Sequence, residues 1–116
     1  MQPLPGYALA VIPKEKFTRY ALNPRVAPDK AIVFERALGY TAENVDKLIE
    51  NIRSHLGDFP CKEKGDIGYG MTYEVRMTLV GENGKSAGVL TAWIKDKKNG
   101  ELRLTSAYVK KRKEGN

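Results

Sequence analysis

Polar side chains that could act on a phosphate chain recur at every second position near residue 75. Thr72, Glu74, Arg76 and Thr78 alternate there with the apolar residues of 71–79. Such alternation is typical of a β-strand with one buried face and one exposed face. Arginine offers several N–H donors to a phosphate, and a glutamate can accept a proton from a hydroxyl group. The pattern therefore predicts an exposed sheet face that can bind a phosphate chain.

Two more strand-like runs, 88–95 and 101–109, follow this segment, and each is preceded by an Asn-Gly dipeptide. Asn-Gly between alternating hydrophobic residues is a strong signal for a hairpin turn. The three runs therefore predict a meander of antiparallel strands. Continued alternation places four more residues on the same exposed face: Thr91, Trp93, Arg103 and Thr105.

Trp93 is the residue on this face that could stack on a nucleic-acid base. The alternative is that its strand is offset by one residue. Trp93 would then pack in the core, and Leu90, Ala92 and Ile94 would face outward. Three outward apolar residues are less favourable than one tryptophan, so we expect Trp93 to face outward.

Cleavage of RNA without a metal ion requires a base near the 2′-hydroxyl, an acid at the leaving oxygen and cations around the phosphorus. Glu74 is a possible base, and His55 is an outside candidate because its pKa lies near neutrality. A lone histidine at the end of a helix more often only interacts with the helix dipole. Cross-strand ion pairs on an ordinary solvated sheet explain the same face equally well. The candidate catalytic residues are Lys30, Arg76, Arg103, Thr105, Ser106, Tyr108 and His55.

No cofactor or metal motif is recognisable in the sequence. The chain has one histidine and one cysteine, so no usual zinc ligand set and no internal disulfide can form. Gly65, Gly68 and Gly70 lack the preceding strand and following helix of a nucleotide-binding loop. We therefore expect neither metal nor cofactor.

Positive charge is concentrated in the second half of the chain. The net charge is +6 overall; residues 1–58 carry eight basic and seven acidic residues, and residues 59–116 carry twelve and seven. Such clustering favours a polyanion such as RNA as the partner. A basic tail that only keeps the protein soluble would give the same uneven distribution of charge. The candidate nucleic-acid-binding residues are Trp93, Lys95, Lys110, Lys111, Arg112 and Lys113.

The pattern of elements predicts one α+β domain over 1–109 with a basic tail at 110–116. Helices are expected at 14–21, 29–38 and 42–56, and strands at 70–80, 88–95 and 101–109, with 7–12 as a possible edge strand. Helices followed by strands are typical of helices that cover one face of an antiparallel sheet. The expected core consists of Val45, Leu48, Ile49, Ile52, Tyr73, Val75 and Met77. No apolar run is long enough to span a membrane, and the single cysteine fits a reducing cytoplasm.

Three stretches, KFTRYALNP, DKAIVFERALGY and TAWIKDKKNGELRLTSAY, resemble a small bacterial domain that occurs alone and at the C-terminal end of large secreted toxins. The resemblance covers most of residues 12–108. This layout is similar to the barnase/EndoU/colicin/RelE-like fold of small ribonuclease toxins. The chain departs from the pattern at Ser106, where the family has a threonine, and in its basic tail. These departures leave the identity of a catalytic hydroxyl open.

The resemblance implies a toxin-like, metal-independent ribonuclease that acts on tRNA, mRNA or ribosome-bound RNA in the cytoplasm and is neutralised by an acidic antitoxin or immunity protein. The alternative is a non-enzymatic binding module, of phage or accessory origin, that holds nucleic acid or an acidic protein on the same basic face.

Overall fold

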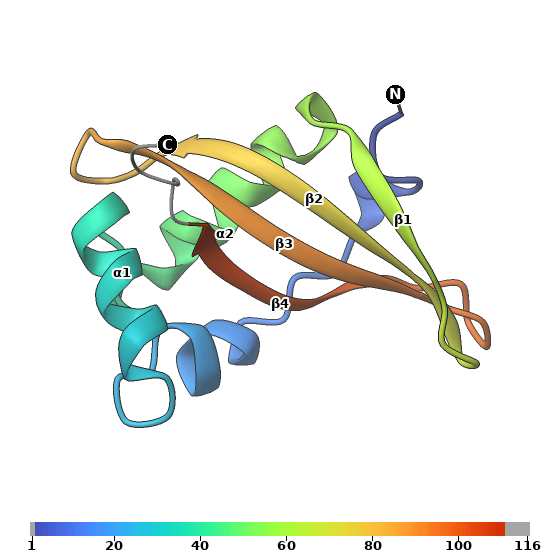
Figure 1. Cartoon of the computed structure of the whole chain (residues 1–116), viewed down its shortest axis with the longest axis horizontal. Helices are drawn as coiled ribbons and strands as arrows, with labels where there is room; N and C mark the ends of the chain where they lie inside the picture. Colours follow the sequence, from blue (N-terminus) through green and yellow to red (C-terminus); the bar gives the residue numbers. More distant parts are fainter. Residues whose placement is uncertain (1, 111–116) are drawn as a thin grey trace, which may run out of the picture.

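The computed structural model describes residues 2–110, which form two α-helices and one four-stranded sheet (Figure 1). The helices are α1 (Pro28–Leu38) and α2 (Val45–His55). The strands are β1 (Cys61–Asp66), β2 (Gly70–Val80), β3 (Ser86–Asp96) and β4 (Leu102–Lys110). Strand order in the sheet is β1-β2-β3-β4, and all neighbours are antiparallel. The predicted α+β class and meander are confirmed.

The sheet has one strand more than the sequence predicted. β1 lies between the predicted helix 42–56 and the predicted strand 70–80, where no element was expected, and it pairs with β2 from Cys61↔Val75 to Asp66↔Met71. The register of this pair shifts between Glu63 and Gly65. Its central residues are exposed and charged, so β1 lacks the apolar alternation by which strands are recognised.

The register between β2 and β3 overturns the expected position of Trp93. Trp93 pairs with Tyr73, and Thr91 pairs with Val75, so both residues lie on the core side of the sheet. Trp93 is 1% exposed and Thr91 is 0% exposed. The alternative register is the correct one, because Leu90, Ala92 and Ile94 occupy the outward side of β3.

A bulge in β4 changes which of its residues face outward. Trp93 pairs with Leu104 and Ala92 pairs with Ser106, so Thr105 is an extra residue in β4. An extra residue shifts the alternation by one position. Leu104 and Ala107 are therefore both buried, and Arg103 and Ser106 share the outward side. The prediction that Thr105 continues the Arg103 face is wrong, and Ser106 holds that position.

The helices form for reasons visible in the sequence. Pro28 begins α1, and Gly39, with φ of 78°, ends it in the left-handed region. The Thr41 hydroxyl accepts from the Glu43 backbone N–H at 3.2 Å, and the Asn44 side chain accepts from the Thr41 N–H at 2.8 Å. This capping pair precedes a 3₁₀ turn, Ala42–Asn44, that leads into α2.

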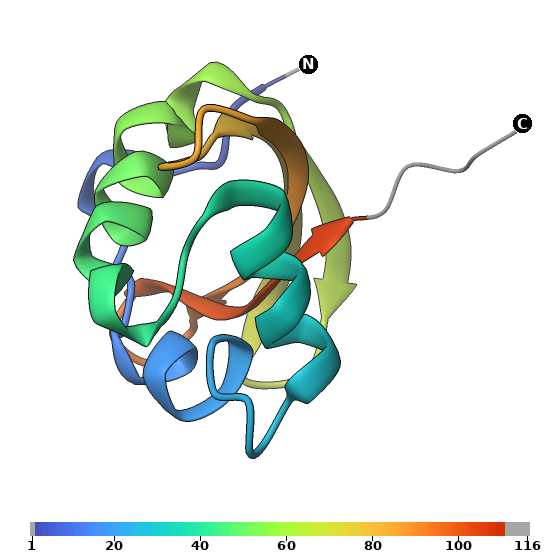
Figure 2. The same ribbon diagram turned by 90° about the vertical axis from the view of Figure 1, so that its left-hand side faces the viewer.

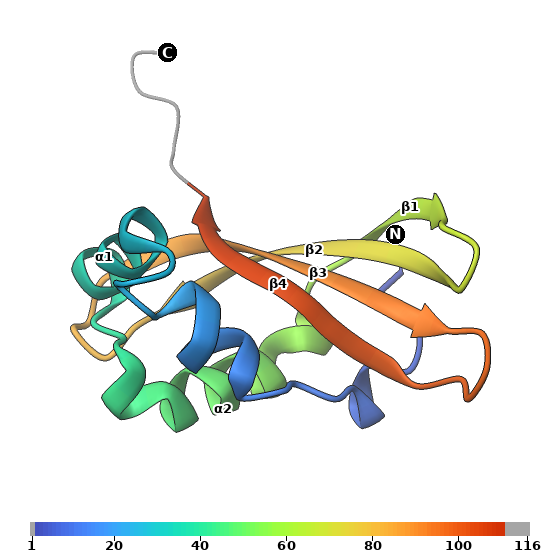
Figure 3. The same cartoon turned by 90° about the horizontal axis from the view of Figure 1, so that it is seen from below.

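The inner face of the sheet is covered by α2 and the N-terminal segment, as Figure 3 shows. Val45, Leu48 and Ile52 of α2 join Val75 and Met77 of β2 in one hydrophobic cluster, and each is at most 2% exposed. Of the seven predicted core residues, Ile49 and Tyr73 are the two that are only partly buried, packed against the margin of this cluster.

The N-terminal segment differs from the expected edge strand. Tyr7–Leu9 is a 3₁₀ turn, and strand-like pairing in residues 2–12 consists of two isolated bridges, an antiparallel one between Pro3 and Pro60 and a parallel one between Val11 and Arg103. The Val11 N–H donates to the Leu102 carbonyl at 2.7 Å, so this segment covers the start of β4. The predicted short helix is present, with a π-helical turn at Phe17–Ala21.

Candidate nucleic-acid interface

Within residues 2–110, no helix lies on the outward side of the sheet (Figures 1 and 3). We call this side the open face. The central strand contributes Leu90, Ala92 and Ile94 to it, and polar residues occupy the strands on either side. Those polar residues include Lys62 and Glu74, which pair across β1 and β2, with Thr72, Arg76, Thr78, Arg103, Ser106 and Tyr108.

One row across the open face brings together Arg76 and Tyr108. Arg76 pairs with Leu90, which in turn pairs with Tyr108. Strands lie about 5 Å apart, so Arg76 and Tyr108 are about 10 Å apart at their backbones. Leu90 is only 8% exposed, so an extended polyanion that crosses this row would contact Arg76 and Tyr108.

Lys30 joins this row from the first turn of α1. Its Nζ lies 5.6 Å from the centre of the Tyr108 ring, which is the geometry of a cation–π contact. Lys30 therefore reaches over the edge of the sheet. Within residues 2–110, neither Lys30 nor Arg76 forms an ion pair.

A smaller hollow of about 230 Å³ continues along β4 from Lys30. Thr105 and Ser106, both exposed, line it together with Lys16 and Tyr20. The Lys16 Nζ lies 5.9 Å from the centre of the Tyr20 ring. Sequence reasoning missed Lys16 and Tyr20 as site residues. Their spacing of four residues, which places two side chains on one helix face, was the available signal.

Arg103 lies on the open face but is already paired with two carboxylates. Its Nη1 lies 3.1 Å from an Asp96 carboxylate oxygen and 3.6 Å from a Glu101 oxygen. The pKa of Asp96 is lowered, first by the hydrogen bond from the Lys98 backbone N–H and then by the bond from Arg103. A phosphate approaching Arg103 would compete with these two carboxylates.

Glu74, which the sequence analysis named as a candidate base, also lies on this face. Its carboxylate lies 3.9 Å from the Lys64 Nζ, and its side chain is 32% exposed. Glu74 and Tyr108 are separated by two strands and one two-residue step along the sheet, on the order of 10 Å. Their side chains can therefore approach one phosphodiester from opposite sides.

Three other predicted residues lie away from this cluster. Trp93 is buried, and its indole N–H donates to the Thr91 hydroxyl at 2.8 Å, so it cannot stack on a base. Lys95 is exposed near the end of β3, on the side of the sheet that also carries Trp93. His55 ends α2 behind the sheet, where its Nδ1 lies 2.9 Å from the Asn51 carbonyl oxygen. This is the position expected of a histidine that only interacts with the dipole at the end of a helix.

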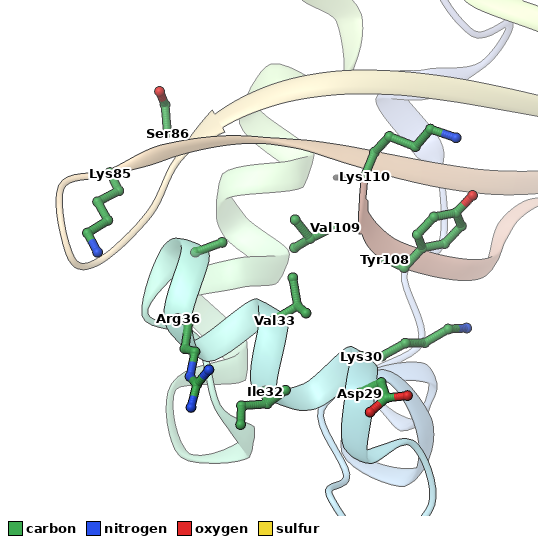
Figure 4. A pocket seen from close by; sticks show the side chains of 11 residues that line it. Asp29, Lys30, Ile32, Val33, Arg36, Lys85, Ser86, Tyr108, Val109 and Lys110 are labelled. Carbon is green, nitrogen blue, oxygen red and sulfur yellow. The ribbon is translucent and has the colours of Figure 1, made fainter. Parts of the chain in front are cut away.

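Lys110 is the last residue of β4, and it projects beside Tyr108 in Figure 4. Lys111, Arg112 and Lys113, the rest of the predicted basic tail, lie outside the described residues. In residues 2–110, no three His, Cys, Asp or Glu side chains are grouped closely enough to hold a metal ion. The helices of that same part of the chain are all too short or too polar to cross a membrane.

Comparison with known proteins places the chain in a family without assigning it an activity. No curated protein and no solved structure matches the chain. One family model matches residues 3–111, which include every described strand and helix. The chain therefore belongs to the family described as Domain of unknown function (DUF6883).

Proposed function

We propose that the protein is a metal-independent ribonuclease that binds RNA across its open face. The observation that carries the proposal is the Lys30 ammonium above the Tyr108 ring, on a face that no described helix covers and in one row with Arg76. The toxin-like sequence pattern over residues 12–108 supports the same activity, with cellular RNA in the cytoplasm as the substrate.

In the proposed reaction, the 2′-oxygen of a ribose attacks the adjacent phosphorus, and the bond from phosphorus to the 5′-oxygen breaks. Glu74 accepts the proton of the 2′-hydroxyl, and the Tyr108 hydroxyl gives a proton to the leaving 5′-oxygen. Lys30 and Arg76 stabilise the negative charge that grows on the phosphoryl oxygens, which is where fixed cations contribute most. The products are a 2′,3′-cyclic phosphate and a 5′-hydroxyl end.

A binding module without catalysis is the second candidate. The apolar centre of the open face and the pairing of Arg103 with Asp96 and Glu101 favour it, because both reduce the polar groups available for chemistry. The two candidates share RNA binding and differ in whether the phosphodiester bond is broken.

Incubation of purified protein with a defined RNA in the presence of EDTA tests the proposal. We expect cleavage with cyclic-phosphate ends, and affinity for RNA that falls linearly with the logarithm of salt concentration. Lys30→Ala should slow cleavage about 100-fold or more, because it removes a cation from the reacting phosphate. The matched control is Lys47→Ala, which removes an exposed lysine of α2 that pairs with Glu82.

Intact RNA after incubation with the wild-type protein, together with salt-dependent binding, would replace the ribonuclease with the binding module. Equal loss of cleavage in Lys30→Ala and Lys47→Ala would show that net charge matters and that the Lys30–Tyr108 contact does not.

A further inference from the structure

α1 lies beside the C-terminal end of β4, as Figure 2 shows. A groove of about 960 Å³ separates the two elements (Figure 4). We call it the basic groove. It is bordered by Lys30 and Arg36 of α1, by Lys85 in the turn before β3, and by Lys110 at the end of β4. Asp29 is the one acidic residue that lines it. The groove therefore carries four positive charges against one negative charge.

None of these four cations forms an ion pair within residues 2–110. Four like charges around one depression repel each other, and an anionic occupant would relieve that repulsion. Their positions on α1, on β4 and beside β3 spread the charge along the groove, so an extended anion can contact all of them.

The floor of the groove is aliphatic. Val33 of α1 and Val109 of β4 point toward each other in Figure 4, and Ala37 also lines the space. Ile32 lies at the margin and is 43% exposed. Val33, Ala37 and Val109 are half-buried, so the groove has a partly accessible apolar floor inside a rim of charged residues, a combination that is typical of protein-interaction surfaces.

We propose that the basic groove binds an acidic, amphipathic segment of a partner protein. The apolar stripe of such a segment would cover Val33, Val109 and Ile32, and its carboxylates would face Arg36, Lys85 and Lys110. RNA fits the groove less well, because Tyr108 is the one aromatic ring among the described residues that line it and the side chains of its floor are aliphatic, which leaves successive bases little to stack on. The inference goes beyond RNA cleavage and stands without it.

Other occupants are disfavoured by charge. The residues that follow Lys110 in the sequence, Lys111, Arg112 and Lys113, have the same sign of charge as the groove. A second copy of the chain carries a net charge of +6 and is also repelled overall. A separate acidic chain is the occupant that complements the groove.

Docking in the groove has a consequence for the open face. Lys30 and Tyr108 line the basic groove as well as the RNA-binding row, so a bound segment would cover both. If the protein is a ribonuclease, the partner would inhibit it. Only this inhibition rests on the proposed function; binding of an acidic segment in the groove does not.

The test uses a synthetic helical peptide of about 18 residues, with leucines on one face and glutamates elsewhere. Its affinity for the full chain is measured by fluorescence anisotropy without RNA. Two control peptides carry glutamine in place of glutamate or the same residues in scrambled order. We expect each control peptide to bind at least about tenfold more weakly than the amphipathic one.

Variants then locate the binding surface. Arg36→Glu combined with Lys85→Glu should weaken binding at least about tenfold, and Ile32→Ser should weaken it several-fold. Lys47→Glu reverses an exposed charge on α2, outside the groove, and should leave the affinity within about twofold. All four positions are exposed, so the fold should be retained, which thermal unfolding can verify.

Equal affinity for the scrambled peptide, or unchanged affinity in the Arg36/Lys85 variant, would overturn the inference. Failure of the amphipathic peptide to bind at about 1 mM would do the same. Loss of RNA affinity in the Arg36/Lys85 variant, without any peptide binding by the wild type, would assign the groove to RNA instead.

Discussion

Thr91 is a fully buried polar residue on the inner face of the sheet. Its hydroxyl donates to the Val75 carbonyl oxygen at 2.9 Å and accepts from the Trp93 indole N–H at 2.8 Å. Both residues are almost completely buried. The Thr91 hydroxyl thus has an acceptor for its own proton and is the acceptor for the indole N–H. Because both polar groups are hydrogen-bonded, the threonine and the tryptophan can be buried together.

Thr91→Val should therefore destabilise the protein although it keeps the shape of the side chain. The substitution leaves the buried indole N–H of Trp93 without an acceptor, which costs about 1–3 kcal/mol of unfolding free energy. Urea denaturation measures the loss. Thr78→Val is the matched control, because Thr78 is exposed on the open face, and it should change stability by less than about 0.5 kcal/mol.

A double variant separates the hydrogen bond from packing. Once Thr91→Val is in place, Trp93→Phe should cost less than it costs in the wild-type protein, because the donor without an acceptor is then removed as well. Strictly additive costs would show that the Thr91–Trp93 hydrogen bond contributes nothing to stability.

At the scale of elements, the sequence predicted the strands by their alternation and failed where alternation was broken. β2 was predicted with its correct bounds, since its odd-numbered residues from Met71 to Leu79 are apolar. β3 carries apolar residues on both sides, so its alternation could not show which side faces the core. β1 is charged along its centre, so it shows no apolar alternation. The bulge at Thr105 could not be predicted, because no residue type in β4 indicates it.

The candidate site was predicted only in part for the same reason. Arg76 and Arg103 lie on the open face, as their alternation predicted, but Ser106 and Tyr108 lie there only because of the bulge at Thr105. Trp93 was assigned to the wrong face because its burial depends on an acceptor, Thr91, that periodicity does not reveal. The ion pairs of Arg103 depend on the turn that connects β3 to β4.

Close contact between the turn after β2 and the end of α1 sets the position of that helix. The Asn83 backbone N–H lies 3.4 Å from the Leu38 carbonyl oxygen, and the Asn83 side chain donates to the Arg36 carbonyl at 3.3 Å. Gly81 precedes Asn83 and leaves no room for a side chain, since a Cβ there would overlap the Leu38 backbone.

Gly81→Ala should therefore destabilise the protein by about 1–3 kcal/mol or more, because the obstacle is backbone that cannot rotate away. Gly88→Ala is the matched control. A Cβ at Gly88 meets its nearest atoms at 3.8 Å, and that residue lies in β3 with ordinary backbone angles. Equal melting temperatures for the two variants would mean that α1 does not depend on this close contact.

The whole molecule presents two surfaces with different chemistry. Helices and the N-terminal segment cover one face of the sheet, and the other face is open. α1 lies beside the end of β4, so its first turn contributes Lys30 to the open face and its side toward β4 borders the basic groove. This arrangement lets one short helix take part in both proposed interactions.

The most direct test of the central claim is the single-turnover rate of RNA cleavage by Tyr108→Phe and Tyr69→Phe. Both variants lose one tyrosine hydroxyl, but Tyr69 is exposed at the far end of β2, next to Gly70. Removal of a general acid slows a reaction about 10²–10⁴-fold, whereas RNA affinity should change little. We predict that Tyr108→Phe slows cleavage by this factor and that Tyr69→Phe cleaves RNA at the wild-type rate. Cleavage by Tyr108→Phe at the wild-type rate would contradict the proposed mechanism.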